Sequence, residues 1–173
     1  MNSEEIFATL AAFSQTMAAE TIAGQSPWPA LQALAQRIVG AKLFTILKTD
    51  LDAGVSRRLY TNMPDAYPVS GTKPLTVTPW FEQVIARKQM FVMNTNEEIA
   101  QHFFDHELII SLGCGSCVNM PVAVRGRILG TVNMLNEEHY FTEERVALVE
   151  HLRIPAMVAF LAHEGEADEG SGC

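Results

Sequence analysis

Hydrophobic residues recur at helical spacing at the start of the chain. Glu4 and Glu5 suit the first turn of a helix that we predict over residues 3–23. Its apolar positions, which follow one side, are Ile6, Leu10, Phe13, Met17 and Ile22. Pro27 and Pro29 then mark the start of a second amphipathic helix, because proline is well tolerated in a first helical turn.

The pattern changes to strands in the middle of the chain. Residues 41–49 and 56–62 flank the turn DLDAG and predict a hairpin. Four prolines then exclude regular structure over residues 64–79, after which Trp80 opens a short helix. The remaining predicted elements are a strand at 90–94, helical turns within 96–111, strands at 117–124 and 128–135, and a helix from Thr142 that Pro155 should kink.

The last hairpin predicts two unlike faces. With Arg-Gly-Arg at 125–127 as a three-residue loop, Asn119 faces Asn133 across the two strands. Because side chains alternate between the faces of a strand, one face carries Cys117, Asn119, Pro121, Ala123, Thr131 and Asn133. The other face is wholly apolar, with Val118, Met120, Val122, Val124, Ile128, Val132 and Met134. We expect helices to cover the apolar face and a cavity to lie on the half-polar face, unless the two asparagines simply satisfy each other.

Composition narrows the class of protein. The chain has 173 residues, of which 48% are hydrophobic and 18% charged, so it is long enough for one globular domain. Its net charge of −8 argues against nucleic acid or an anionic membrane as partner. The acidic start MNSEEIF is unlike a secretory signal, and no apolar run approaches the length of a membrane span. We therefore expect a cytoplasmic protein whose three cysteines are thiols.

The order of these elements, closing with NMPVAVRGRILGTVNML before FTEERVALVEHL, resembles a GAF domain. Stand-alone bacterial GAF proteins carry stretches similar to DAYPVSGTKP and DHELIISLGCGS. The resemblance implies an α+β fold: a central antiparallel sheet of five or six strands, terminal helices on one face and a ligand chamber on the other. We expect a single GAF domain over residues 1–164 and an acidic, disordered tail at 165–173.

The stretch SLGCGSCVNMP, residues 111–121, permits several kinds of chemistry. Spacing alone allows a zinc site, whose ligands would be His102, His106, Cys114 and Cys117, but nothing in the chain requires a metal. The two cysteines could instead form a redox couple, as the similarity to GAF-type free methionine sulfoxide reductases suggests. Those enzymes draw a cysteine from the loop that corresponds to VSGTKPLTVTPWF, which has none here.

A single reactive thiol is a third possibility, with His106 as base and Asp105 as its orienting group. The glycines beside Cys114 would also let backbone N–H groups converge on an anion, which would partly ionise that thiol. In the simplest interpretation both cysteines are small side chains of a core or pocket. We expect Cys117 to point into the chamber and stay inert, and Cys114 to lie near His106 and react first.

Other candidate ligand contacts follow from position. Tyr60 lies on the second strand, Tyr67 and Lys73 lie in the long loop, and Trp80 begins the helix that should cover the chamber. With His106, Cys114, Cys117, Asn119 and Asn133, they complete the predicted ligand-binding set. Lys73 favours an anionic or carboxylate ligand.

No strong catalytic signature is present, so the primary hypothesis is a small-molecule sensor or binding module without a cofactor or metal. A cysteine-dependent enzyme is the alternative. A second alternative is an interaction module without a ligand. Whichever of these functions holds, we expect a homodimer that forms through the first and last helices.

Overall fold

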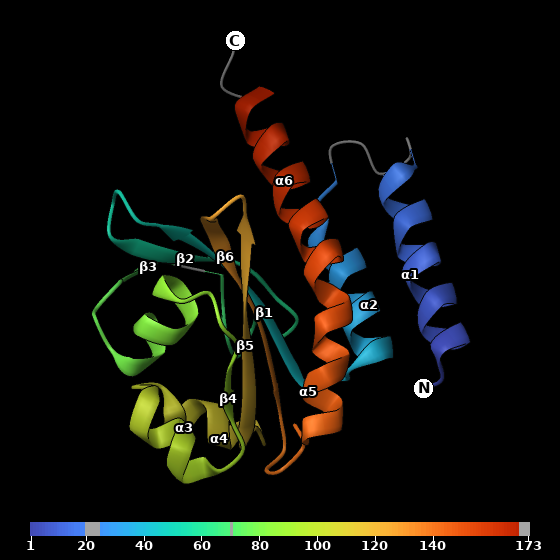
Figure 1. Cartoon of the computed structure of the whole chain (residues 1–173). Coiled ribbons are helices and arrows are strands. Elements are labelled where there is room, and N and C mark those ends of the chain that lie inside the picture. Colours follow the sequence, from blue (N-terminus) through green and yellow to red (C-terminus); the bar gives the residue numbers. More distant parts are fainter. Residues whose placement is uncertain (20–24, 70, 170–173) are drawn as a thin grey trace.

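The protein has three layers, with one antiparallel sheet between two layers of helices (Figure 1). The computed structural model describes residues 1–19, 25–69 and 71–169. Within them, six strands are ordered β3-β2-β1-β6-β5-β4 across the sheet. Their bounds are β1 Leu43–Asp50, β2 Val55–Thr61, β3 Thr72–Pro74, β4 Phe91–Met93, β5 Ser116–Val124 and β6 Arg127–Asn136. The α+β fold predicted from the sequence is confirmed.

The first helical layer contains both ends of the chain. It consists of α1 (Ser3–Ala18), α2 (Trp28–Ile38), α5 (Glu143–Val149) and α6 (Arg153–Glu169). Helix α1 begins after Asn2 with a capping box. The Asn2 side chain accepts a hydrogen bond from the Glu5 backbone N–H, and the Glu5 side chain accepts one from the Asn2 backbone N–H. The last part of the helix predicted over 3–23 lies outside the described residues.

The terminal helix is interrupted where proline requires it. A 3₁₀ turn, Glu150–Leu152, separates α5 from α6. Pro155 lies in the first turn of α6 and has no N–H to donate to the preceding turn. Helix α6 then continues to Glu169, beyond residue 164, so the first part of the predicted tail is helical. The rest of that tail, residues 170–173, lies outside the described residues.

This terminal helix also corrects an expectation about apolar length. By length and composition alone, Glu143–Gly165 is long and apolar enough to cross a membrane. In the fold, one side of it covers the sheet, where Leu152, Ala156 and Phe160 are buried. A helix that packs against a sheet can therefore have the length and apolar composition of a membrane-spanning helix.

The terminal hairpin has the predicted register through most of its length. Asn119 pairs with Asn133 and the two faces are as expected up to Val122, but a bulge at Leu129 then shifts the pairing. The loop is a two-residue turn in which Arg125 and Gly126 both have positive φ, rather than a three-residue loop. The prediction for Ile128 is therefore wrong: it packs on the chamber side of the sheet, while Leu129 packs against the helices.

A second layer covers the opposite face of the sheet. It contains the π-helix η2 (Phe81–Ala86), α3 (Asn96–His102) and α4 (His106–Ser111) (Figure 1). The loop before η2 also forms β3, which pairs with β2, so the prolines did not exclude regular structure there as predicted. Pro74 is compatible with this strand because β3 is the edge of the sheet.

Each face of the sheet has its own hydrophobic core. The larger core includes Phe44, Met120 and Met134 beneath the helices α1, α2, α5 and α6. The smaller core lies between the sheet and the second layer, where Leu43, Cys117 and Leu135 meet Val84, Ile99 and Ile109. The polar cavity described next interrupts this smaller core.

Candidate functional site: a polar chamber above the sheet

A cavity of about 70 Å³ lies on the half-polar face of the sheet. Strands β1, β2, β5 and β6 form its floor, and the segments around Tyr67, Trp80 and Asp105 cover it. Its lining residues are Thr45, Leu47, Arg58, Tyr67, Lys73, Trp80, Phe103, Asp105, Ile109, Cys117, Asn119, Asn133 and Leu135. The chamber therefore lies on the face that the hairpin pattern predicted.

A chain of hydrogen bonds crosses the floor of this cavity. The Trp80 indole Nε1–H donates to Asn119 Oδ1 at 3.0 Å, and Asn119 Nδ2 donates to Asn133 Oδ1 at 2.7 Å. Asn133 Nδ2 then donates to Thr45 Oγ1 at 3.2 Å. The two asparagines thus line the chamber and also satisfy each other, so both interpretations of this pair hold. This chain of hydrogen bonds holds Trp80 over the sheet, where it forms part of the roof of the cavity.

Arg58 reaches the chamber because of a second β-bulge. Ile46 pairs with Tyr60 but Leu47 pairs with Arg58, so Leu59 is an extra residue on β2. The bulge places Arg58 on the chamber face, beside Leu47. The Arg58 guanidinium lies 3.8 Å from the centre of the Tyr67 ring, and its Nη1 donates to the Pro68 carbonyl.

Two buried polar atoms on this face lack a hydrogen-bond partner among the described residues. They are Arg58 Nε and Thr131 Oγ1. Both residues pair with Leu47, from the strands on either side of β1, so they share one row of the sheet. Buried polar groups are normally satisfied by protein, water or ligand. Arg58, which lines the cavity, therefore keeps one hydrogen-bond donor that no described residue satisfies.

Asp105 is the only carboxylate among the described residues that line this cavity. Its Oδ2 accepts hydrogen bonds from the Tyr67 hydroxyl at 2.5 Å and from Lys73 Nζ at 3.3 Å. Burial, together with the hydrogen bond to Asp105 and its negative charge, raises the pKa of the Tyr67 phenol well above its usual value. Tyr67 therefore remains a hydrogen-bond donor at physiological pH.

A second hollow, of about 160 Å³, adjoins the first. The residues that line both are Leu47, Lys73, Trp80, Phe103 and Asp105. The ion pair of Lys73 with Asp105 is part of the partition between them. Cavities of about 150 Å³ in other proteins hold a benzene-sized ligand. The two hollows together would therefore accept a larger molecule than the first alone.

Six of the nine predicted ligand contacts meet at the chamber. Tyr67, Lys73, Trp80, Cys117, Asn119 and Asn133 line it. Tyr60 does not: it pairs with Ile46 on the helical side of the sheet and donates a hydrogen bond to Gln32 of α2. The bulge at Leu59 is the reason, because it breaks the alternation that would place Arg58 and Tyr60 on one face. His106 is also outside the lining, and its Nδ1 lies 2.9 Å from the Phe103 carbonyl.

Cys114 is buried in the smaller core and does not line the chamber, contrary to the prediction. The backbone N–H groups of Gly113, Cys114 and Gly115 donate to the carbonyls of Ile110, Ile109 and Asn136. They are therefore not directed at an anion. Burial raises the pKa of the Cys114 thiol, although Lys42 acts in the opposite direction. Both observations argue against the expected partial ionisation of Cys114.

Cys117 also remains a thiol. Burial raises the pKa of this side chain well above its usual value, and the hydrogen bond with Asn119 offsets only part of that effect. A protonated thiol is a poor nucleophile and a poor metal ligand. Among the described residues, no three His, Cys, Asp or Glu side chains form a group that could hold a metal ion.

Sequence reasoning missed Arg58 and gave Asp105 a different role. Nothing in the local pattern SRRLYTN marks which arginine a bulge will turn inward. Asp105 was considered as an orienting group for His106, but it bonds to Tyr67 and Lys73 instead. The sequence does predict Tyr67 and Lys73 as chamber residues. A search for a carboxylate that could pair with them was the available signal for the role of Asp105.

Comparison with known proteins establishes the family. A family model described as GAF domain matches residues 30–153, so the chain belongs to the GAF family. No curated protein matches the sequence at a significant level. The fold is similar to the GAF domain of a phosphoenolpyruvate-protein phosphotransferase from Acinetobacter, with a TM-score of 0.69, 12% identity, and coverage of 97% of this chain and 99% of that one.

Two further structures show the same fold. The GAF domain of the phosphoenolpyruvate-protein phosphotransferase from Coxiella burnetii has a TM-score of 0.68 and 15% identity, and 99% of each chain is covered. The free methionine-R-sulfoxide reductase of Neisseria meningitidis, solved with its substrate, has a TM-score of 0.64 and 15% identity, with 95% of each chain covered. At these identities the similarity concerns the fold alone.

Proposed function

We propose that this GAF domain binds a small molecule in the chamber and acts as a sensor or binding module in the cytoplasm. The observation that carries the proposal is that Arg58, which lines a cavity with several polar side chains, has a buried Nε that lacks a partner among the described residues. The chamber also contains Lys73 and a single carboxylate, Asp105, so its net charge favours an anionic ligand.

A cysteine-dependent enzyme is supported less well. The structural similarity to a free methionine-R-sulfoxide reductase is consistent with it. However, both described thiols are buried and have raised pKa values, and Cys114 is outside the lining of the chamber. A thiolate nucleophile would require a change in these surroundings.

Adjacent arginines offer a matched test of ligand binding. Arg58 lines the chamber, whereas Arg57 is exposed on the other face of β2. Native mass spectrometry of the protein as purified, followed by a thermal-shift screen of small carboxylates and their neutral amides, would identify a ligand. We expect Arg58→Met to abolish the shift given by the best hit and Arg57→Met to retain it. Equal responses of the two variants would show that the hit binds elsewhere.

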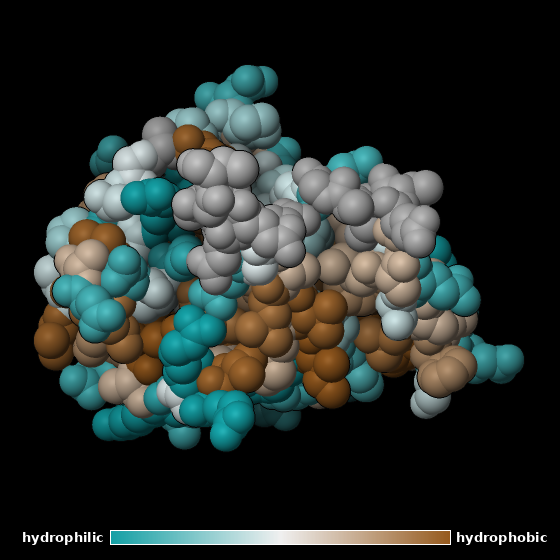
Figure 2. Space-filling model, turned by 90° about the horizontal axis from the view of Figure 1, so that it is seen from above, coloured by the Kyte–Doolittle hydropathy of each residue, from teal (hydrophilic) through white to brown (hydrophobic). Residues whose placement is uncertain are grey.

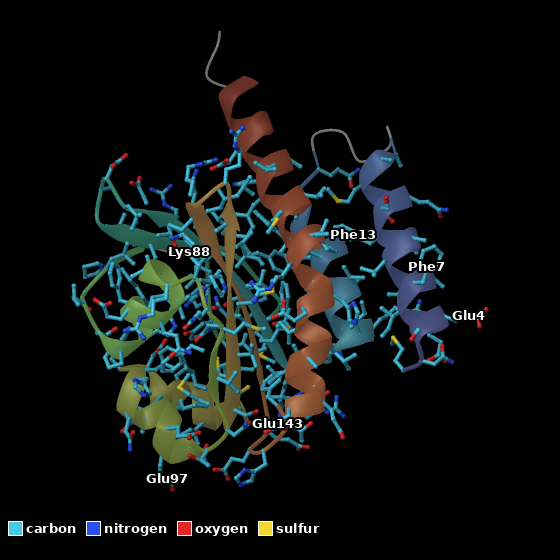
Figure 3. The ribbon with its side chains drawn as sticks, in the orientation of Figure 1. Glu4, Phe7, Phe13, Lys88, Glu97 and Glu143 are labelled. Carbon is cyan, nitrogen blue, oxygen red and sulfur yellow. The ribbon has the colours of Figure 1, made fainter. Side chains whose placement is uncertain are left out.

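We also propose that the domain forms a homodimer through α1 and α6. An apolar groove of about 380 Å³ lies between these helices, with Leu10, Phe13, Ile154, Pro155 and Val158 in its lining. Phe13 is directed from α1 toward α6, whereas Phe7 is on the outer surface of α1 (Figure 3). Seen from above, apolar side chains form a broad band along one side of the molecule (Figure 2).

Two exposed apolar side chains of α1 and α6 suit a two-fold interface. Phe7 is 73% exposed and Ile154 is 72% exposed, so each copy offers both projecting side chains and a groove to receive them. We expect sedimentation analysis to give a dimer for the native chain and a monomer for Ile154→Glu. Val77→Glu, at an equally exposed residue in the loop before η2, is the control and should leave the dimer intact. A monomeric native chain at micromolar concentration would exclude the interface.

A further inference from the structure

One ion pair forms part of the partition of the chamber. Lys73 and Asp105 both line the 70 Å³ cavity and the 160 Å³ hollow beside it. Their side chains come from β3 and from the short connection between α3 and α4, so the contact joins two segments far apart in the sequence. Separation of this pair would remove part of the wall and connect the hollows.

The ion pair of Lys73 with Asp105 is weakened by the solvent exposure of Lys73. The Lys73 side chain is 43% exposed and that of Asp105 is 15% exposed, so water screens the lysine. Lys73 Nζ also lies 4.3 Å from the centre of the Phe104 ring, which is itself 80% exposed. Lys73 can therefore exchange one anionic partner for another with little loss of burial.

The charges of the chamber restrict how a ligand anion can enter. With Asp105 in place, a ligand carboxylate beside Lys73 would meet a like charge, which is unfavourable at such short range. If Asp105 moves out, the ligand carboxylate meets Lys73 and the Tyr67 hydroxyl, with Arg58 Nε also on the chamber wall. These are the donors that Asp105 now uses, together with one donor that has no partner among the described residues.

We propose that the Asp105 carboxylate occupies the place of a ligand carboxylate, so that a small carboxylate binds by displacing Asp105 from Lys73. This inference rests on the proposed function and specifies both the ligand class and its effect on the protein. Displacement connects the two hollows. It also removes one tertiary contact of residues 103–111, which include the exposed side chains Phe104, Leu108 and Ile110. That segment would report occupancy of the chamber to a partner.

Propionate is a suitable probe, with neutral propionamide as its isostere. Binding is followed by NMR through the Trp80 indole N–H signal, assigned with a Trp80→Phe variant, because this group lies in the roof of the chamber. We expect Asp105→Asn to bind propionate about fivefold more tightly than the native protein, since the competing carboxylate is lost. Glu107→Gln removes the same charge from an exposed position two residues away and should leave the Kd unchanged.

Hydrogen exchange distinguishes displacement from a general change in charge. Propionate should speed exchange in residues 103–111 of the native protein and should not do so in Asp105→Asn. Asp105→Ala provides a second variant should the asparagine side chain keep the Tyr67 contact, and Lys73→Met should lose propionate binding.

Each outcome decides one of the two proposals. If propionate shifts the Trp80 signal but neither Asp105 variant binds it more tightly, the displacement is wrong and the binding chamber stands. If propionamide binds as tightly as propionate, the displacement is likewise wrong and the binding chamber stands. If neither compound shifts the signal in any variant, the carboxylate ligand class is wrong. Failure of the chamber itself would appear in the screen, as equal responses of Arg57→Met and Arg58→Met.

Discussion

Arg58 and Tyr60 are two residues apart on one strand, yet they lie on opposite faces of the sheet. Arg58 pairs with Leu47 and lines the chamber, whereas Tyr60 pairs with Ile46 and contacts α2. The extra residue between them, Leu59, packs with Tyr60 on the helical side. Without the inserted residue, the strand would present both side chains to one face. With it, the strand places a cation in the lining of the chamber.

The position of Tyr60 gives the first prediction. Its hydroxyl bonds to Gln32 in a half-buried contact between β2 and α2. We expect Tyr60→Phe to lower the free energy of unfolding by about 1 kcal/mol, the usual net value of such a bond. Urea denaturation measures this change. Ligand binding by the variant should be unchanged, and a loss of binding would mean that Tyr60 contacts the chamber.

The asparagine pair should show strong energetic coupling. Asn119→Leu leaves the Trp80 indole N–H and Asn133 Oδ1 without their present partner, and each buried orphan costs about 1–3 kcal/mol. Asn133→Leu similarly orphans Asn119 Nδ2. Since the double variant Asn119→Leu/Asn133→Leu removes both ends of one bond, we expect its destabilisation to be less than additive by about 1 kcal/mol. Additive effects in urea denaturation would show that the hydrogen bond contributes nothing.

Burial of Cys114, Cys117 and Tyr67 predicts a loss of stability at alkaline pH. Their folded pKa values are raised from the ordinary values of 9.0 for a thiol and 10.0 for a phenol. Below about pH 8 both folded and unfolded states keep nearly all of these protons, so their contribution is constant. Above about pH 8 the unfolded chain loses protons first, and the free energy of unfolding falls as pH rises.

Urea denaturation between pH 7.5 and 10.5 tests this sign. Cys114→Ala/Cys117→Ala should have a flatter profile above pH 9 than the native chain. In a Cys173→Ser background, both described thiols should react with a thiol reagent at neutral pH far more slowly than in the unfolded protein. Of the two, Cys114 should react first because Lys42 favours its thiolate. Rapid labelling of either thiol would contradict its burial.

Several elements could be predicted because their determinants are local. The terminal hairpin has strict alternation of side chains, so the pairing of Asn119 with Asn133 and the position of Cys117 followed directly. The bulges at Leu59 and Leu129 could not be predicted, because an extra residue in a strand depends on how its neighbours pack. Asp105 reaches the chamber through the path of a loop, and no periodicity in the sequence encodes that path.

Gly130 supplies the last prediction, at the contact between the sheet and the terminal helix. A Cβ atom built there would lie 2.0 Å from the Leu47 carbonyl oxygen and 2.7 Å from the Phe160 ring. The carbonyl belongs to β1 and the ring is buried, so neither can move away cheaply. We expect Gly130→Ala to cost about 1–3 kcal/mol in thermal or urea unfolding. Gly165→Ala in α6 is the control, because its Cβ meets nothing within 4 Å and helix propensity favours alanine. If Gly130→Ala were as stable as this control, β6 could not lie as close to α6 and β1 as the fold requires.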